Sequence, residues 1–176
     1  HLIDRSMLEG GEWHDVRDRH LGRLLGAQTI GVVGAGYVGR AVIALFRAFG
    51  ARVLVFDPLL SGEAAAKLGV ARRPLDDLLA ESDVVTLHAP VLPETRGMLG
   101  AEQLGRLRDG ALFINTARSA LVVEPALLAE LRSGRIAAAL DVFDQEPLAA
   151  DSPFRGLDNV ILSPHAAGHT IDTYQR

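Results

Sequence analysis

The residues best suited to chemistry are an arginine, a glutamate and a histidine that each follow a short apolar segment: Arg118, Glu146 and His165. Hydride transfer to a 2-oxo acid needs a cation for the carboxylate, an acid for the developing alkoxide, and a group that adjusts this acid. The planar guanidinium of Arg118 suits a carboxylate, and an imidazole such as that of His165 exchanges a proton near neutral pH. A carboxylate beside the ring, here Glu146, favours imidazolium and fixes its orientation. We therefore predict a catalytic trio in which protonated His165 serves ketone reduction and neutral His165 serves alcohol oxidation.

Each of these residues also has a plainer interpretation when it is taken singly. Arg118 could be a solvated or salt-bridged surface residue, and Glu146 before Pro147 could belong only to a turn. His88 fits a hydrogen-bonded strand end as well as an acid, so we assign it no catalytic role. Three further histidines lack the spacing of metal ligands, and no metal site is predicted: His14, His20 and His169.

A glycine-rich segment from Gly34 to Gly39 follows one apolar run and precedes a helical pattern. Gly34 permits a tight turn, Gly36 lets the backbone approach a pyrophosphate, and Gly39 allows close packing of helix on strand. A helix that begins near Tyr37 directs free N–H groups at the phosphates. Asp57 ends the next apolar run, where a carboxylate binds the adenosine ribose and repels a 2′-phosphate. This pattern predicts NAD as the cofactor; the alternative is an ordinary glycine turn and a solvated strand end.

The elements that position these residues alternate between short apolar runs and amphipathic stretches. Near-continuous apolar runs predict strands covered on both faces of a parallel sheet, at Thr29–Val33, Arg52–Phe56, Asp83–Leu87, Ala111–Asn115, Ala137–Asp141 and Asn159–Leu162. Leucine, valine and phenylalanine at helical spacing predict helices between them, over 38–49, around 75–79, around 104–107 and over 125–133. The alternation predicts an α/β fold with a doubly wound, mostly parallel sheet of the Rossmann type.

Composition excludes several classes of protein. The chain has 176 residues, of which 48% are hydrophobic and 23% charged, enough for one well-packed domain. A formal net charge of −4 disfavours a general nucleic-acid partner, and no apolar run is long enough to predict a membrane span. With no cysteine the chain has no disulfide or thiolate site, in keeping with a cytoplasmic protein. The common hydrolase and nucleoside-triphosphatase motifs are absent from the sequence.

The sequence resembles the D-isomer-specific 2-hydroxyacid dehydrogenases in five ordered blocks. These are Gly34–Gly39, His88–Pro90 with Glu94–Gly97, Ile114–Arg118, Ala139–Phe143 with Glu146-Pro147, and Ser163–His165 with Gly168 and Thr170. The resemblance implies Arg118 as the substrate-orienting cation, His165 as the acid/base and Glu146 as its partner. Asp141 is implied to hold the nicotinamide carboxamide. The cofactor site so expected comprises Gly34, Gly36, Tyr37, Val38, Gly39, Asp57, Ala89, Pro90, Thr95, Thr116, Ala117, Arg118, Asp141, His165 and Gly168.

The resemblance also implies how the chain is organised. Residues 1–27 are expected to be an entering helix and connector, 28–169 the dinucleotide-binding domain, and 170–176 the start of a helix returning to a substrate domain outside this chain. A homodimer through this domain is implied as well. One departure is Ser119, where the family most often has glycine; a positive φ there would strain serine.

Two other readings of the same residues stay open. One is a corepressor-type protein that senses NAD(H) and acts through partners. The other is a dehydrogenase with a similar domain, such as an adenosylhomocysteinase-like enzyme, against which the trio of Arg118, Glu146 and His165 speaks.

Overall fold

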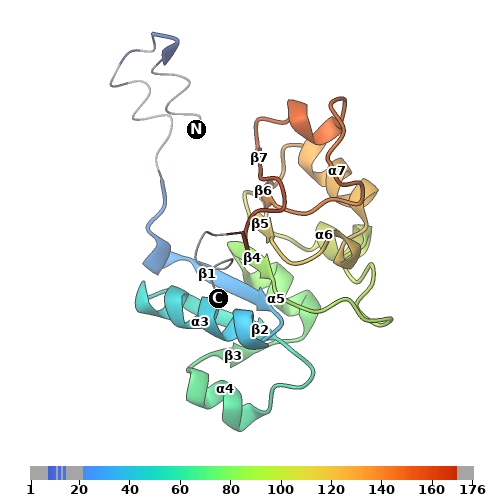
Figure 1. The fold of residues 1–176 in the computed structure, drawn as a ribbon. Helices are drawn as coiled ribbons and strands as arrows, with labels where there is room; N and C mark the ends of the chain where they lie inside the picture. The colour runs from blue at the N-terminus through green and yellow to red at the C-terminus, as the bar shows by residue number, and fades with distance from the viewer. Residues whose placement is uncertain (1–7, 11, 13, 15–21, 170–176) are drawn as a thin grey trace.

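The computed structural model describes residues 8–10, 12, 14 and 22–169, whose centre is one seven-stranded sheet (Figure 1). The strands are β1 (Thr29–Val33), β2 (Arg52–Phe56), β3 (Ala71–Arg72), β4 (Val84–Leu87), β5 (Leu112–Asn115), β6 (Ala137–Leu140) and β7 (Val160–Leu162). Their order is β3-β2-β1-β4-β5-β6-β7, and each pair in it is parallel. The predicted doubly wound sheet is confirmed, and it is parallel throughout rather than mostly so.

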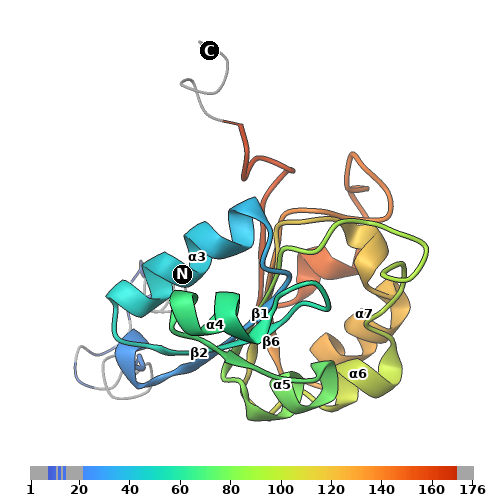
Figure 2. The ribbon, with the colours of Figure 1, turned by 90° about the horizontal axis from the view of Figure 1, so that it is seen from below.

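Helices cover both faces of the sheet (Figures 1 and 2). They are α3 (Tyr37–Ala48), α4 (Gly62–Leu68), α5 (Leu75–Glu81), α6 (Ala101–Gly105) and α7 (Glu124–Arg132), with 3₁₀ turns η1 (Leu25–Ala27), η2 (Ser119–Leu121) and η3 (Pro153–Gly156). Helices α3 and α4 share one apolar core with alternate residues of β1 and β2, such as Val32 and Val55. Helices α5, α6 and α7 share the other core with Leu54, Leu87 and Phe113.

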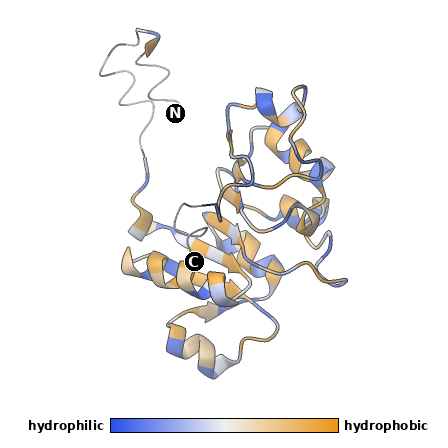
Figure 3. Cartoon of the chain, viewed as in Figure 1, coloured by the Kyte–Doolittle hydropathy of each residue, from blue (hydrophilic) through white to orange (hydrophobic). Residues whose placement is uncertain are grey.

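Burial on both faces explains why the strand segments are so apolar (Figure 3). Residues 30–33 of β1 and 53–55 of β2 are all buried. Successive side chains point to opposite faces of a strand, so a strand that is covered twice needs apolar residues at every position. The six predicted strands are confirmed to within one residue at each end.

Helix boundaries follow the expected glycines. Helix α3 begins after Gly36 and ends one residue before Phe49, with Gly50 at a φ of +80°. Helix α7 carries a proline in its first turn and is followed by Gly134 at a φ of +74°. Glycine adopts this left-handed conformation without the steric cost that a Cβ brings.

The sequence carries no pattern that predicts helix α4 and strand β3. Ser61 caps α4 by accepting a hydrogen bond from the Ala64 N–H at 3.1 Å, and Gly69 ends it at a φ of +64°. The helix has seven residues and is rich in alanine, while β3 has two residues. Neither is long enough to show a periodic apolar pattern.

The predicted entering helix and connector lie largely outside the described residues, as do residues 170–176. Of the connector, the structure describes η1 directly before β1. Among the residues that are described, no helix has the length and apolar character needed to cross a membrane.

Candidate active site

The sheet reverses its strand order at β1, which pairs with β2 on one side and with β4 on the other. In open parallel sheets a ligand crevice forms at such a point, beyond the carboxyl ends of the strands. A cavity of about 540 Å³ lies there, which we call the switch-point cavity. It is lined by Gly36, Tyr37, Val38, His88, Ala89, Pro90, Val91, Ala117 and Arg118. The fold therefore brings the glycine-rich segment and the predicted cation Arg118 to one cavity.

The three glycines of this segment have three different steric environments. Gly34 has a φ of +95°, and a Cβ there would lie 2.8 Å from the backbone of His88 and Ala89. At Gly39 a Cβ would lie 2.1 Å from the Gly34 carbonyl oxygen, which confirms the predicted close packing. At Gly36 no protein atom beyond the residue and its chain neighbours lies within 4 Å of the Cβ position, and Gly36 lines the switch-point cavity. The open space at Gly36 fits a pyrophosphate in contact with the backbone.

Asp57 lies beside the glycine-rich segment at the end of β2. One carboxylate oxygen accepts the Ala35 N–H at 2.7 Å and the other accepts the Leu59 N–H at 2.8 Å. Each carboxylate oxygen has about two lone pairs, so each retains one for another donor. The carboxylate is therefore held in place with capacity left for the two hydroxyls of a ribose.

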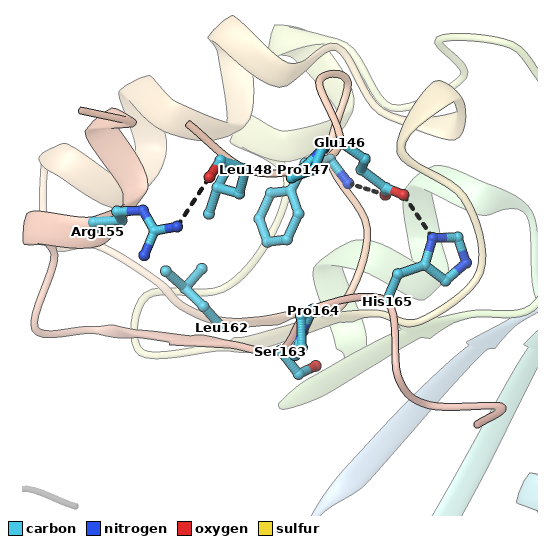
Figure 4. A pocket seen from close by; sticks show the side chains of 9 residues that line it. Glu146, Pro147, Leu148, Arg155, Leu162, Ser163, Pro164 and His165 are labelled. Carbon is cyan, nitrogen blue, oxygen red and sulfur yellow. Dashed lines mark hydrogen bonds and ion pairs between the residues drawn. The ribbon is translucent and has the colours of Figure 1, made fainter. Parts of the chain in front are cut away.

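His165 and Glu146 form the pair that the sequence predicted (Figure 4). His165 Nδ1 and Glu146 Oε2 lie 2.7 Å apart, and Glu146 Oε1 accepts the Phe143 N–H at 2.9 Å. The bond to His165 and then that to Phe143 lower the pKa of Glu146. An ionised carboxylate can only accept, so Nδ1 carries the hydrogen of this bond. Nε2 of His165 is then the ring atom available for proton exchange.

Asp141 fixes the backbone that carries His165. Its side chain is 1% exposed and accepts hydrogen bonds from the Ser163 hydroxyl and from the N–H groups of Ala166 and Ala167. Its carbonyl oxygen accepts the His165 N–H at 2.9 Å. Burial acts to raise the pKa of Asp141, but the hydrogen bonds from Ser163, Ala167 and Ala166 outweigh burial and lower it.

This anchoring matters because His165 has a φ of +52°. A left-handed backbone at a residue other than glycine costs about 1–3 kcal/mol and persists only where surrounding contacts impose it. The loop from Ser163 to Ala167, bound at both oxygens of Asp141, supplies those contacts. The strained backbone aims the imidazole at Glu146.

Arg118 is exposed and is positioned through its backbone. The Asn115 side chain, on a residue only 2% exposed, accepts the Ala117 N–H at 3.0 Å and donates to the Arg118 carbonyl oxygen at 3.0 Å. Among the described residues other than glycine, only His165 has a positive φ, so Ser119 carries no such strain.

His88 behaves as a structural strand-end residue. Its Nε2 lies 3.0 Å from the buried Thr86 hydroxyl, and burial lowers the pKa of its imidazole. The ring is therefore held neutral beside the glycine-rich segment, which agrees with our giving it no acid role.

The other predicted site residues differ in their surroundings. The Thr95 hydroxyl donates to the Pro90 carbonyl oxygen at 2.7 Å and accepts the Leu92 N–H at 2.8 Å, so it supports the loop after β4. Thr116 and Gly168 are exposed. His165 and Glu146 line a second cavity of about 680 Å³, whereas Arg118 lines the switch-point cavity.

Sequence reasoning missed the positioning role of the buried Asn115, and it named Asp141 for the cofactor without foreseeing that Asp141 also anchors the loop of His165. The signal available was an uncharged amide or a carboxylate at the last position of an apolar strand, where burial demands a partner. Within the described part of the chain, no group of three metal-binding side chains comes together.

Comparison with known families matches residues 1–167 to "D-isomer specific 2-hydroxyacid dehydrogenase, NAD binding domain". Among curated proteins, the glyoxylate reductase of Korarchaeum cryptofilum is 42% identical over 98% of this chain and 53% of its own length. The D-3-phosphoglycerate dehydrogenase of Archaeoglobus fulgidus is 42% identical over 95% of this chain and 31% of its own. The chain thus spans about half or less of the length of these relatives.

Solved structures give the same result. A phosphoglycerate oxidoreductase from Rhizobium etli superposes with a TM-score of 0.89 at 36% identity, covering 98% of this chain and 52% of its own. A D-2-hydroxyisocaproate dehydrogenase superposes with a TM-score of 0.85 at 30% identity, covering 96% and 54%. The D-lactate dehydrogenase of Lactobacillus jensenii, solved with NAD⁺, has a TM-score of 0.83 at 28% identity, covering 98% and 55%.

Proposed function

Because the chain belongs to the D-isomer-specific 2-hydroxyacid dehydrogenase family, as its NAD-binding domain, we propose that it serves an enzyme interconverting 2-oxo acids and D-2-hydroxy acids. The observation that carries this proposal is the hydrogen bond between His165 and Glu146, at the same end of the sheet as Arg118 and the glycine-rich segment. A bound NAD(H) would deliver or accept the hydride. Arg118, Glu146 and His165 all belong to this chain.

The cofactor is held by the residues around the switch-point cavity and by Asp57. The N–H groups at the start of α3 would bind the pyrophosphate, which could approach the backbone at Gly36, and Asp57 would accept hydrogen bonds from the adenosine ribose hydroxyls. Asp141 uses three of about four lone-pair positions on the loop of His165. One position is left for the N–H of a nicotinamide carboxamide, in line with its implied role.

His165 exchanges the proton and Arg118 orients the substrate. Glu146 holds Nδ1 of the ring, so Nε2 donates a proton to the alkoxide in reduction and accepts it in oxidation. The guanidinium of Arg118 binds the substrate carboxylate and polarises the neighbouring carbonyl. Glu146 acts through His165 and is a positioning residue in this scheme.

We also propose that two copies associate through the exposed face of α3. Val38, Leu45 and Phe49 lie on one face of this helix and its C-terminal cap, and Leu45 and Phe49 are 63% and 65% exposed. Apolar residues gathered on one helix face mark an interaction surface more often than single ones do. Light scattering of wild type and Leu45→Glu tests this: a monomer in both, or a dimer in both, contradicts it.

Cytoplasmic location and the lack of a nucleic-acid partner stay predictions from composition.

The proposed function is tested in two steps. The 176-residue chain should bind NADH in a fluorescence titration, while the whole protein that carries it should reduce small 2-oxo acids with NADH. A chain that is folded by circular dichroism but does not bind NADH would contradict the proposal. Binding without turnover by the whole protein would favour the corepressor-type reading instead.

A further inference from the structure

A third cavity lies at the carboxyl ends of β2 and β3 and is bordered by Asp57. Its volume is about 310 Å³, and we call it the ribose-end cavity. It is lined by Phe56, Asp57, Pro58, Arg72, Arg73 and Pro74. Asp57 therefore borders this cavity while its two oxygens accept N–H groups from Ala35 and Leu59.

The two arginines of this cavity are engaged differently. Arg73 Nε donates to Glu81 Oε1 at 2.9 Å, and Arg52 donates to the other oxygen of Glu81 at 2.8 Å. The bond from Arg73, more than that from Arg52, lowers the pKa of Glu81, so this carboxylate is ionised and offsets a positive charge. The Arg72 side chain is exposed and, within the described part of the chain, makes no ion pair or side-chain hydrogen bond.

Charges of both signs surround the ribose-end cavity. Asp57 contributes one negative charge, Arg72 one positive charge, and the cluster of Arg52, Arg73 and Glu81 one further positive charge. If Asp57 binds the ribose hydroxyls, a substituent on the ribose 2′-oxygen lies beside Asp57 and enters the ribose-end cavity. An anionic substituent there meets the repulsion of Asp57 and the attraction of Arg72.

We propose that the ribose-end cavity is a latent binding site for the 2′-phosphate of NADP(H), with Arg72 as the cation that binds it. This inference rests on the proposed placement of the adenosine ribose at Asp57. An arginine near the ribose accommodates a 2′-phosphate in dinucleotide-binding folds, and its planar fork matches phosphate oxygens. The negative charge of Asp57 then disfavours NADP(H). Once that charge is removed, Arg72 determines how much the ratio of NADPH to NADH affinity rises.

The test uses the 176-residue chain, NADH and NADPH, with nicotinamide fluorescence as the readout. Asp57→Asn keeps the size of the side chain and removes its charge, and the ratio of NADPH to NADH affinity should rise roughly tenfold or more. Adding Arg72→Gln should lower that ratio again by about tenfold. Arg132→Gln is the matched control, since Arg132 is exposed on α7 away from the cavity.

Salt supplies a second readout. Raising ionic strength should weaken NADPH binding more in Asp57→Asn than in the variant that also lacks Arg72, because the additional charge pair is exposed and screened. If Asp57→Asn does not fold, Asp57→Ser with and without Arg72→Gln makes the same comparison. Arg72→Gln and Arg132→Gln are each added to the chain that carries Asp57→Asn or Asp57→Ser. If the two double variants have equal NADPH-to-NADH affinity ratios, the inference is overturned. Failure of the wild-type chain to bind NADH contradicts the proposed function instead.

Discussion

Replacing Asp141 by asparagine removes the negative charge that accepts hydrogen bonds from the loop that carries His165. One oxygen of Asp141 accepts both the Ser163 hydroxyl and the Ala166 N–H, so an asparagine oxygen can keep those two bonds. The amide nitrogen must then face the Ala167 N–H, which bonds to the second carboxylate oxygen at 2.9 Å. A lost hydrogen bond to a charged group costs about 1.5–3 kcal/mol. For a domain of this size that cost lowers Tm by roughly 3–12 °C.

The pH dependence of this loss has a definite sign. The folded-state pKa of Asp141 is below its ordinary value, so its contribution to stability is present above the unfolded pKa of about 3.9 and disappears as pH falls through the folded pKa. The gap in unfolding free energy between wild type and Asp141→Asn should be full at pH 7 and narrow as the pH falls below about 4.

Urea unfolding followed by circular dichroism between pH 7 and pH 3 measures this gap, with Asp144→Asn as the control. Asp144 is exposed in the loop after β6, and its replacement should change stability by less than about 0.5 kcal/mol. Equal midpoints for wild type and Asp141→Asn at pH 7 would refute the anchoring role. A gap that is constant down to pH 3 would refute the assignment of the effect to the ionised carboxylate.

Further outcomes are expected for variants at three places: the glycine-rich segment, His165 and Asn115. Gly36→Ala should leave Tm unchanged but weaken NADH binding at least tenfold, because a Cβ at Gly36 meets no protein atom beyond its chain neighbours. Gly39→Ala should lower Tm, because a Cβ there lies 2.1 Å from a carbonyl oxygen. Calorimetry and NADH titration of both variants measure this, and equal losses of Tm would contradict it. His165→Ala should reduce turnover of the whole protein by about 10²–10⁴-fold with little change in NADH affinity. In the same variant the pKa of Glu146, followed by NMR, should rise toward its ordinary value because the bond that lowers it is gone; an unmoved pKa would show that the pair is not formed. Asn115→Ala should raise KM for the 2-oxo acid more than it changes NADH affinity, since Asn115 holds the backbone of Arg118; rescue by Asn115→Asp is not expected, because a carboxylate cannot donate to that carbonyl.

Much of the fold could be predicted because the relevant signals are local. A strand buried on both faces is apolar along nearly its whole length. Residues 29–33 and 111–115 can therefore be predicted as strands without knowing which strands lie beside them. Helix α3 ends at Ala48, two residues before Gly50, because the chain leaves the helix through a positive φ at Gly50. Helix α4 and strand β3 escaped prediction because seven and two residues carry too little pattern.

By itself, the sequence determined which residue types are available for catalysis and what each segment requires of its own backbone and burial. Gly34, Gly36 and Gly39 predict a phosphate-binding loop because each meets a steric requirement that involves only a few residues of the chain. The tertiary structure alone decided the distances: Glu146 reaches His165 across 19 positions of sequence at 2.7 Å. It also decided that Asp141 imposes a positive φ on His165. Such contacts depend on the order and register of neighbouring strands, which are set by the packing of the whole sheet rather than by any single segment.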